Sequence, residues 1–138
     1  MISERAAAVV CEVLRVGDLF PSPWKFSNER LPTDGDQFVA VRPGTDVTDG
    51  TIQKTGETVI HYGVQILVRA RDSDTAFRKA SAIVQYIQQK RDAVTVNGKT
   101  FRVVGWSLTT PPSHLTTESQ NQREVWVTNG LATIKEGA

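Results

Sequence analysis

Residues 61–90 constrain the fold more than any other part of the chain. They read HYGVQILVRARDSDTAFRKASAIVQYIQQK, in which an alternating strand pattern passes directly into a helical pattern. Side chains alternate across a strand, so its apolar face is expected in the core. That face comprises Tyr62, Val64, Ile66, Val68 and Ala70. Asp72 or Ser73 can cap the helix, which is expected to pack back on the strand through its apolar stripe. That stripe comprises Ala76, Ala80, Ile83, Val84 and Ile87.

The N-terminal third of the chain predicts one helix, one connector and one inner strand. The helix pattern can be capped by Ser3 and ended by Gly17. Residues 20–36 hold three prolines and a glycine, which favour an irregular connector. Residues 37–42 (QFVAVR) are apolar on both faces, as is typical of an inner strand.

The C-terminal third predicts a hairpin and a final strand. Asn97-Gly98 separates two strand-like runs and is the dipeptide preferred in type I′ hairpin turns. Residues 109–122 are polar and broken by prolines, and residues 123–135 (REVWVTNGLATIK) read as the last strand. We therefore expect one α+β domain over residues 1–138. Its sheet would be mostly antiparallel, with about five strands and two helices packed on it.

Residues 44–58 have the least capacity to bury their own side chains. They contain three glycines and only two sizeable apolar side chains, Val47 and Ile52. Little burial is therefore available to offset the conformational entropy that ordering removes. We expect a long mobile loop or a loose hairpin at about residues 44–58, with Val47 and Ile52 able to meet a partner.

Composition and charge exclude several classes of function. The 138 residues are 39% hydrophobic and 22% charged, which is typical of a soluble globular chain, and no apolar run could span a bilayer. Charged residues interrupt the first apolar stretch, so we expect no signal peptide. The formal net charge is +1, which gives little drive for tight nucleic-acid binding. Cys11 is the only cysteine, which excludes an internal disulfide and indicates a reducing cytoplasm.

No group of side chains in the sequence predicts catalysis, a metal or a cofactor. His61 and His114 lack further ligands at metal-binding spacing, and Cys11 lies in a helical pattern without signs of an activated thiol. Asp34 and Asp36 resemble part of a calcium loop, but its other ligands are missing and a turn explains them better. Neither a glycine-flanked nucleophile nor a phosphate-binding loop is present. We expect a protein without enzymatic activity, metal or cofactor.

Three stretches, taken in order, resemble the tail terminator proteins of long-tailed bacteriophages, which are also described as tail completion or minor capsid proteins. They are GVQILVR with its helix at residues 63–90, the hairpin followed by PPSHL, and NQREVWVTNG near the end of the chain. The resemblance covers about residues 60–130. The chain departs from the family pattern after Asn129, where Gly130 replaces an aromatic residue.

The resemblance implies a small α+β subunit that forms a hexameric ring at the head-proximal end of the tail tube. This ring would stop tube polymerisation and offer the surface to which the head binds. The implied partners are further copies of the chain, the major tail tube protein and a head completion or connector protein. Genomic DNA would pass through the lumen without specific binding. The implied location is the virion tail, after synthesis in the host cytoplasm and with no membrane contact.

The resemblance also suggests where partners bind. The strands at residues 63–69 and 123–128 would be the ring-building framework. Charges of both signs lie at the ends of the helix that follows the first of these strands, and they favour an ordinary solvated surface over a nucleic-acid site. The candidate interface residues are Val47, Ile52, Gln65, Leu67, Arg69, Arg71 and Arg123. Two alternatives remain open: a head-side connector or neck protein, and a ferredoxin-like module that binds RNA or a small ligand. A purified ring would favour assembly, whereas a monomer with bound nucleotide would favour the module.

Overall fold

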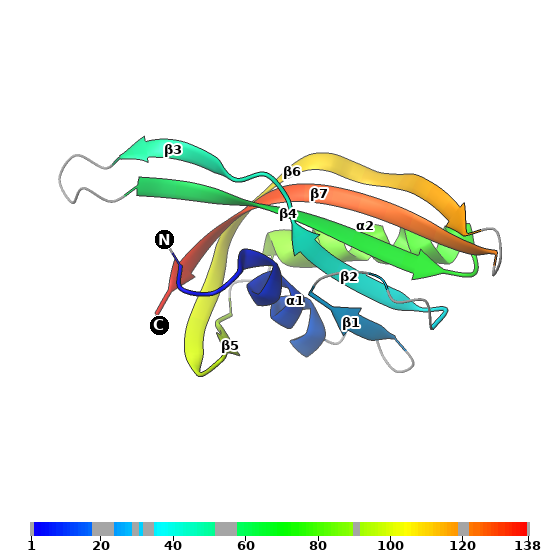
Figure 1. The fold of residues 1–138 in the computed structure, drawn as a ribbon, viewed down its shortest axis with the longest axis horizontal. Helices are drawn as coiled ribbons and strands as arrows, with labels where there is room; N and C mark the ends of the chain where they lie inside the picture. Colours follow the sequence, from blue (N-terminus) through cyan, green and yellow to red (C-terminus); the bar gives the residue numbers. More distant parts are fainter. Residues whose placement is uncertain are drawn as a thin grey trace.

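The structure, a computed structural model, describes residues 2–17, 24–28, 31, 35–51, 58–89, 92–118 and 122–137. Within these residues two helices pack against a curled sheet (Figure 1). The helices are α1 (Ala6–Val16) and α2 (Ser73–Gln89). The strands are β1 (Lys25–Ser27), β2 (Phe38–Pro43), β3 (Val47–Thr51), β4 (Thr58–Ala70), β5 (Val94–Val96), β6 (Lys99–Glu118) and β7 (Arg123–Glu136).

The sheet is larger and more mixed than the sequence predicted. In the described part of the chain it has seven strands, in the order β1-β2-β4-β7-β6-β5 with β3 paired separately to β4. β1 runs parallel to β2, and the other described pairs are antiparallel. The prediction of one mostly antiparallel sheet of about five strands is therefore wrong. The chain forms a curled, mixed half-barrel with two helices, although its overall class is α+β.

The sequence did not specify β1 or the exact course of β3, and both strands owe their conformation to neighbouring strands. β1 lies in the predicted connector at residues 20–36 and is only three residues long. β3 lies in residues 44–58, where a mobile loop or a loose hairpin was expected, and pairs with β4. Short segments without clear alternation give no local signal, because strand preference depends strongly on the strand alongside. Residues 52–57 lie outside the described residues, and the mobility of residues 44–58 stays a prediction.

β6 continues through a region that the sequence predicted to be broken. Residues 109–122 are polar and contain Pro111 and Pro112, yet β6 reaches Glu118. Its register with β7 shifts between Leu108 and Thr110, between Thr110 and Ser113, and between His114 and Thr116. β-bulges of this kind allow an edge strand to contain prolines, which cannot donate a ladder hydrogen bond.

The Asn97-Gly98 turn joins β5 to β6 as predicted. Asn97 has a φ of 51° and Gly98 a φ of 78°. A type I′ turn requires positive φ at both central residues, so the geometry confirms the hairpin.

The helix ends agree with the sequence at two places and differ at one. Asp72 caps α2, because its Oδ2 accepts a hydrogen bond from the backbone N–H of Thr75 at 3.1 Å. Gly17 follows the last residue of α1 as predicted. Ser3 does not cap α1, which begins without a side-chain cap. Instead, its hydroxyl donates to Oε1 of Glu136 at 2.7 Å, which ties the N-terminal segment to β7.

The main core lies between the helices and one face of the sheet. The even-numbered side chains of β4 contribute Val64, Ile66 and Val68, all almost fully buried, as their alternation predicted. The helices contribute their buried apolar sides, which are Ala7, Val9, Val10, Val13 and Leu14 on α1 and Ala76, Ala80, Ile83 and Ile87 on α2. Among the largest buried side chains are Val10, Leu14, Ile83, Ile87 and Phe101. Burial of these side chains is the main favourable term that holds helices and sheet together.

Between β2 and β3 the chain crosses the face of β4. β2 pairs with residues 64–69 of β4, whereas β3 pairs with residues 58–61. Figure 1 draws β2 and β3 on opposite sides of β4, with the connecting chain passing over it. β4 is therefore an inner strand of the sheet along one part and the partner of β3 along the other. We call residues 47–51 and 58–61 the arm, since they project from the body of the subunit.

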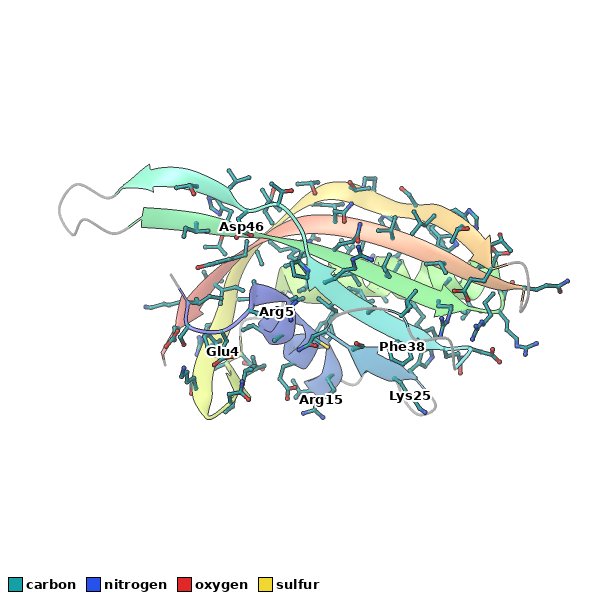
Figure 2. All side chains as sticks on the ribbon, in the orientation of Figure 1. Glu4, Arg5, Arg15, Lys25, Phe38 and Asp46 are labelled. Atoms are coloured by element: carbon teal, nitrogen blue, oxygen red, sulfur yellow. The ribbon has the colours of Figure 1, made fainter. Side chains whose placement is uncertain are left out.

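Gly63 is the residue of β4 over which the chain crosses. Its carbonyl accepts the N–H of Gly44 at 2.8 Å, and its own N–H donates to Oδ1 of Asp46 at 2.9 Å. Figure 2 labels Asp46, which lies between β2 and β3. A Cβ atom at Gly63 would lie only 2.3 Å from the carbonyl oxygen of Thr45. Because the obstructing atoms belong to the backbone, no side-chain movement could make room. The crossing therefore requires glycine at position 63.

Gly63→Ala should lower the free energy of unfolding by about 1–3 kcal/mol, as overpacking of a tight contact does. Gly105→Ala is the matched control, because a Cβ there would meet the Thr133 side chain at an ordinary 3.5 Å. Urea unfolding of both variants measures the difference. Equal midpoints would contradict the steric account of the crossing.

Candidate partner interface

The odd-numbered side chains of β4 lie on the sheet face opposite the helices, which we call the second face. It carries three groups of residues. The polar row is Arg42, Gln65, Thr109 and Asn129; the apolar patch is Ala40, Leu67, Val125 and Val127; the charged cluster is Asp36, Arg69, Glu118 and Arg123. Four of the predicted interface residues, Gln65, Leu67, Arg69 and Arg123, therefore share one face.

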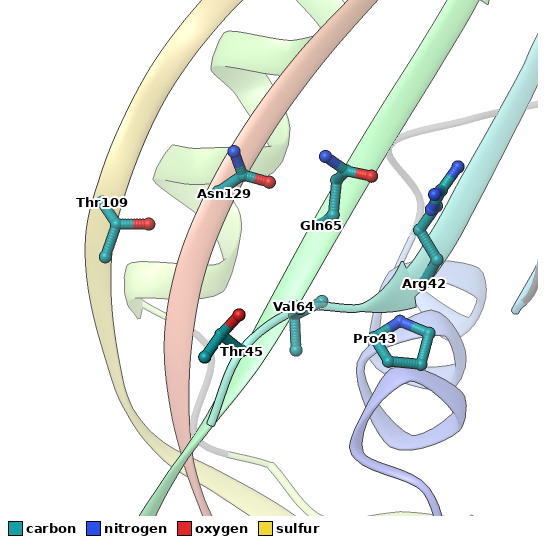
Figure 3. Close-up of a pocket in the computed structure, with 8 residues that line it drawn as sticks. Arg42, Pro43, Thr45, Val64, Gln65, Thr109 and Asn129 are labelled. Carbon is teal, nitrogen blue, oxygen red and sulfur yellow. The ribbon is translucent and has the colours of Figure 1, made fainter. Parts of the chain in front are cut away.

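The polar row crosses the sheet at one register level. Arg42 is paired with Gln65, and Gln65 with Asn129. Figure 3 shows these side chains on neighbouring strands, with the helices behind the sheet. Together with Thr109 they line an open cavity of about 630 Å³. Guanidinium, amide and hydroxyl groups can bind carboxylates or backbone groups of a partner. The sequence pointed to Gln65 but missed Arg42 and Asn129, because only strand register brings them together.

The apolar patch is covered within the subunit. Leu67 pairs in register with Ala40 on one side and Val127 on the other, and all three are buried. Leu31 packs against the same patch. Leu67 thus supports the second face from below the surface, and its part in a partner interface stays a prediction.

Two buried arginines form the centre of the charged cluster. Arg69 is 1% exposed and Arg123 is 4% exposed. Both donate to the carbonyl oxygen of Gly35, from Nη2 of Arg69 at 2.6 Å and Nη1 of Arg123 at 2.8 Å. Glu118 lies 3.5 Å from Nη1 of Arg69 and 3.0 Å from Nε of Arg123. The cluster joins β4, β6 and β7 to the segment before β2.

The two buried arginines of this cluster need the nearby carboxylates to compensate their charge. Burial lowers the pKa of Arg69, and the nearby charge of Arg123 lowers that pKa further, whereas Glu118 opposes both effects. Asp36 lies 3.8 Å from Arg123 and forms a 2.7 Å ion pair with the exposed Arg71. Buried charges are stable only when they are paired and hydrogen-bonded, so the two carboxylates compensate the two arginines.

The remaining predicted interface residues lie elsewhere. Val47 is an exposed residue of the arm. Arg71 lies just beyond the end of β4, where it borders the charged cluster through Asp36. Ile52 lies outside the described residues. Val47 pairs with His61, so residues 62–70 of β4 separate it from the group around Arg71.

The histidines and the cysteine make structural contacts. His61 Nδ1 lies 2.8 Å from the Thr133 hydroxyl, and His114 Nε2 lies 2.6 Å from Oε2 of Glu124. Hydrogen bonds from Thr117 and then His114 lower the pKa of Glu124. Burial raises the pKa of the Cys11 thiol to about 11. Within the described residues no cluster of potential ligands could hold a metal ion. Neither α1 nor α2 combines the length and hydrophobicity that a membrane crossing requires.

Glu118→Gln should lower the free energy of unfolding by about 1–3 kcal/mol, because it leaves two buried arginines with less compensating charge. Asp74→Asn is the matched control. Its partner Arg78 is 3.0 Å away at an exposed position, and loss of such a pair costs less than about 0.5 kcal/mol. Thermal or urea unfolding checks the difference, and similar small losses in both variants would show that the cluster contributes little.

Comparisons with known proteins bear on the family and the fold of the chain. A family model described as bacteriophage tail terminator protein matches residues 15–135. A chain in the solved structure of the virion of a native gene transfer agent particle aligns over 96% of each chain, with a TM-score of 0.54 and 18% sequence identity. At this identity the likeness shows a shared fold. No curated protein matches the sequence. Because the family model spans most of the chain, this protein belongs to the bacteriophage tail terminator family and is a structural protein of the virion tail.

Proposed function

We propose that this protein forms a hexameric ring on the head-proximal end of the tail tube. The ring stops tube polymerisation and provides the surface to which the head connector binds. The observation that carries the proposal, beside the family, is the separation of two unlike surfaces along β4. The arm lies at one end of the subunit, and the charged cluster with Arg71 lies at the other (Figure 1).

A protein that joins two partners needs a separate surface for each. The arm offers Val47 and the backbone groups of β3, which in the described part of the chain pairs only with β4. An extended partner could add to it by β-type hydrogen bonding, which would offset the cost of ordering residues 44–58. This arrangement suits a contact that forms during assembly.

The opposite end of the subunit presents exposed charged side chains above the buried arginines. The ion pair of Arg71 and Asp36 is exposed, and such pairs add little to stability. Arg71 is therefore available to a charged partner at small cost, whereas Asp36 also compensates the buried Arg123. Arg69 and Arg123 lie beneath them and hold the segment at Gly35 against the sheet. In this proposal Gln65, Leu67, Arg69 and Arg123 form the supporting framework, and Arg71 makes direct contacts.

The lumen of the ring must let genomic DNA pass. A net charge of +1 suits this role, because each additional phosphate contact would add salt-dependent affinity and slow the passage of DNA. The proposal therefore includes no specific DNA-binding site. The major tail tube protein and the head completion protein are its partners.

A phage with an early stop codon in this gene tests the proposal. Its tails should include tubes longer than those of the wild type, because the ring that ends polymerisation is missing. They should also carry no heads, because the joining surface is missing. Electron microscopy of purified tails gives the length distribution. Supply of the intact protein from a plasmid is the control and should restore both properties.

Tails of normal length that bear heads would contradict the proposal. Tails of normal length without heads would instead support the head-side connector, since only the joining step would then depend on this protein.

A further inference from the structure

The outer edge of β6 is open over most of its length. β6 pairs with β7 along one edge, and along the other it pairs with β5 only at residues 99–101. Among the described strands none pairs with that outer edge from residue 102 to residue 118. Figure 1 draws β6 as the outermost strand along the upper side of the sheet. Backbone N–H and C=O groups along such an edge can pair with another strand.

Residues 103–110 of β6, which we call the open edge, lack charge and proline. They read VVGWSLTT, whereas natural edges are usually protected by charged side chains or prolines. Val104 and Leu108 are 42% and 38% exposed. The register with β7 is regular from Gly105 to Leu108 and shifts on either side. A short strand would therefore fit the open edge better than a long one.

β3 is a short strand with an open edge of its own. It is five residues long and in the described part of the chain pairs with β4 alone. Its sequence, VTDGT, contains one charged residue, so pairing with the uncharged open edge brings no like charges together. The arm also carries β3 away from the helices, which makes it accessible to another molecule (Figure 1).

We propose that β3 of one subunit pairs with the open edge of β6 in the next subunit of the ring. This inference rests on the ring of the proposed function. Because two different surfaces meet, the contact is head-to-tail and can repeat around a closed ring. Pairing of β6 with β6 would join only two copies and would leave the outer edges of both β3 strands without a partner. The contact is short and would therefore be weak between two isolated subunits. Closure of the ring and binding to the tail tube add further contacts within the same assembly, so multivalency stabilises it.

Disulfide cross-linking tests the contact in assembled tails. Thr48→Cys on β3 is combined in turn with Val104→Cys, Ser107→Cys or Thr109→Cys on the open edge, since facing residues of paired strands lie within disulfide range. Cys11 is buried and its thiol has a pKa of about 11, so the natural chain is an unreactive background. Oxidation should give a ladder of covalent multimers for at least one combination. The single variants should give no ladder.

The outcomes separate this contact from the ring itself. Rings visible on tails without a ladder for any combination would overturn the β3–β6 contact and leave the proposed function intact. Cross-links from Thr48→Cys to the tail tube protein would overturn it in favour of the tube as the partner of the arm. Tails without any ring of this subunit would overturn both proposals.

Charge placed on the edge provides a second measurement. Val104→Lys with Leu108→Lys should reduce the fraction of tails that carry a ring at least about tenfold, because lysine discourages edge pairing. Leu115→Lys is the matched control, as this residue is 54% exposed on β6 beyond the open edge. It should assemble normally. Monomer melting temperatures should change little in both variants, and equal assembly of the two would contradict the inference.

Discussion

The absence of a side chain at Gly63 is the constraint on which the rest of the structure depends. It lets the backbone at Thr45 pass directly over β4, where any Cβ atom would meet it. One strand can therefore serve two purposes, as an inner strand of the sheet and as the base of the arm. Without the crossing, β3 would have to continue β2 along the same edge of β4. The arm would then lie on the other side of β4, and the contacts proposed for it would change.

Different interactions stabilise the two faces of the sheet. On the helix side, Val64, Ile66 and Val68 pack into an apolar core, in which burial supplies the free energy. On the second face, Arg69 and Arg123 are buried together and depend on their carboxylate partners and the Gly35 carbonyl. Such a cluster is costly to disturb, which makes it a rigid base. In the proposed function, a subunit that meets partners at both ends would benefit from this rigidity.

Local signals in the sequence predicted local structure. The unit of β4 and α2 followed from alternation, a helical stripe and the Asp72 cap, and the β5–β6 hairpin followed from Asn97-Gly98. β1 was not predicted, and residues 44–58 predicted only a mobile loop or a loose hairpin, because the strand conformation of β1 and β3 comes from β2 and β4 rather than from their own residues. Pro111 and Pro112 suggested a break, which bulges in the long β6 accommodate.

The candidate interface was only partly visible in the sequence. Alternation placed Gln65, Leu67 and Arg69 on one face, but it could not show that Leu67 and Arg69 are covered by residues from distant segments. Gly35 and Glu118 reach Arg69 only through the folded sheet. Arg42 and Asn129 likewise join Gln65 through strand register. These are long-range pairings, for which a single sequence carries no local pattern.

The most direct test of the central claim is a cryo-electron microscopy map of the head-proximal end of the purified tail, at a resolution that traces strands. A closed ring of this subunit is expected between tube and connector. In that ring, an additional strand from the neighbouring subunit lies along residues 103–110 of β6. A map in which the tube meets the connector with no ring of this subunit between them would contradict it.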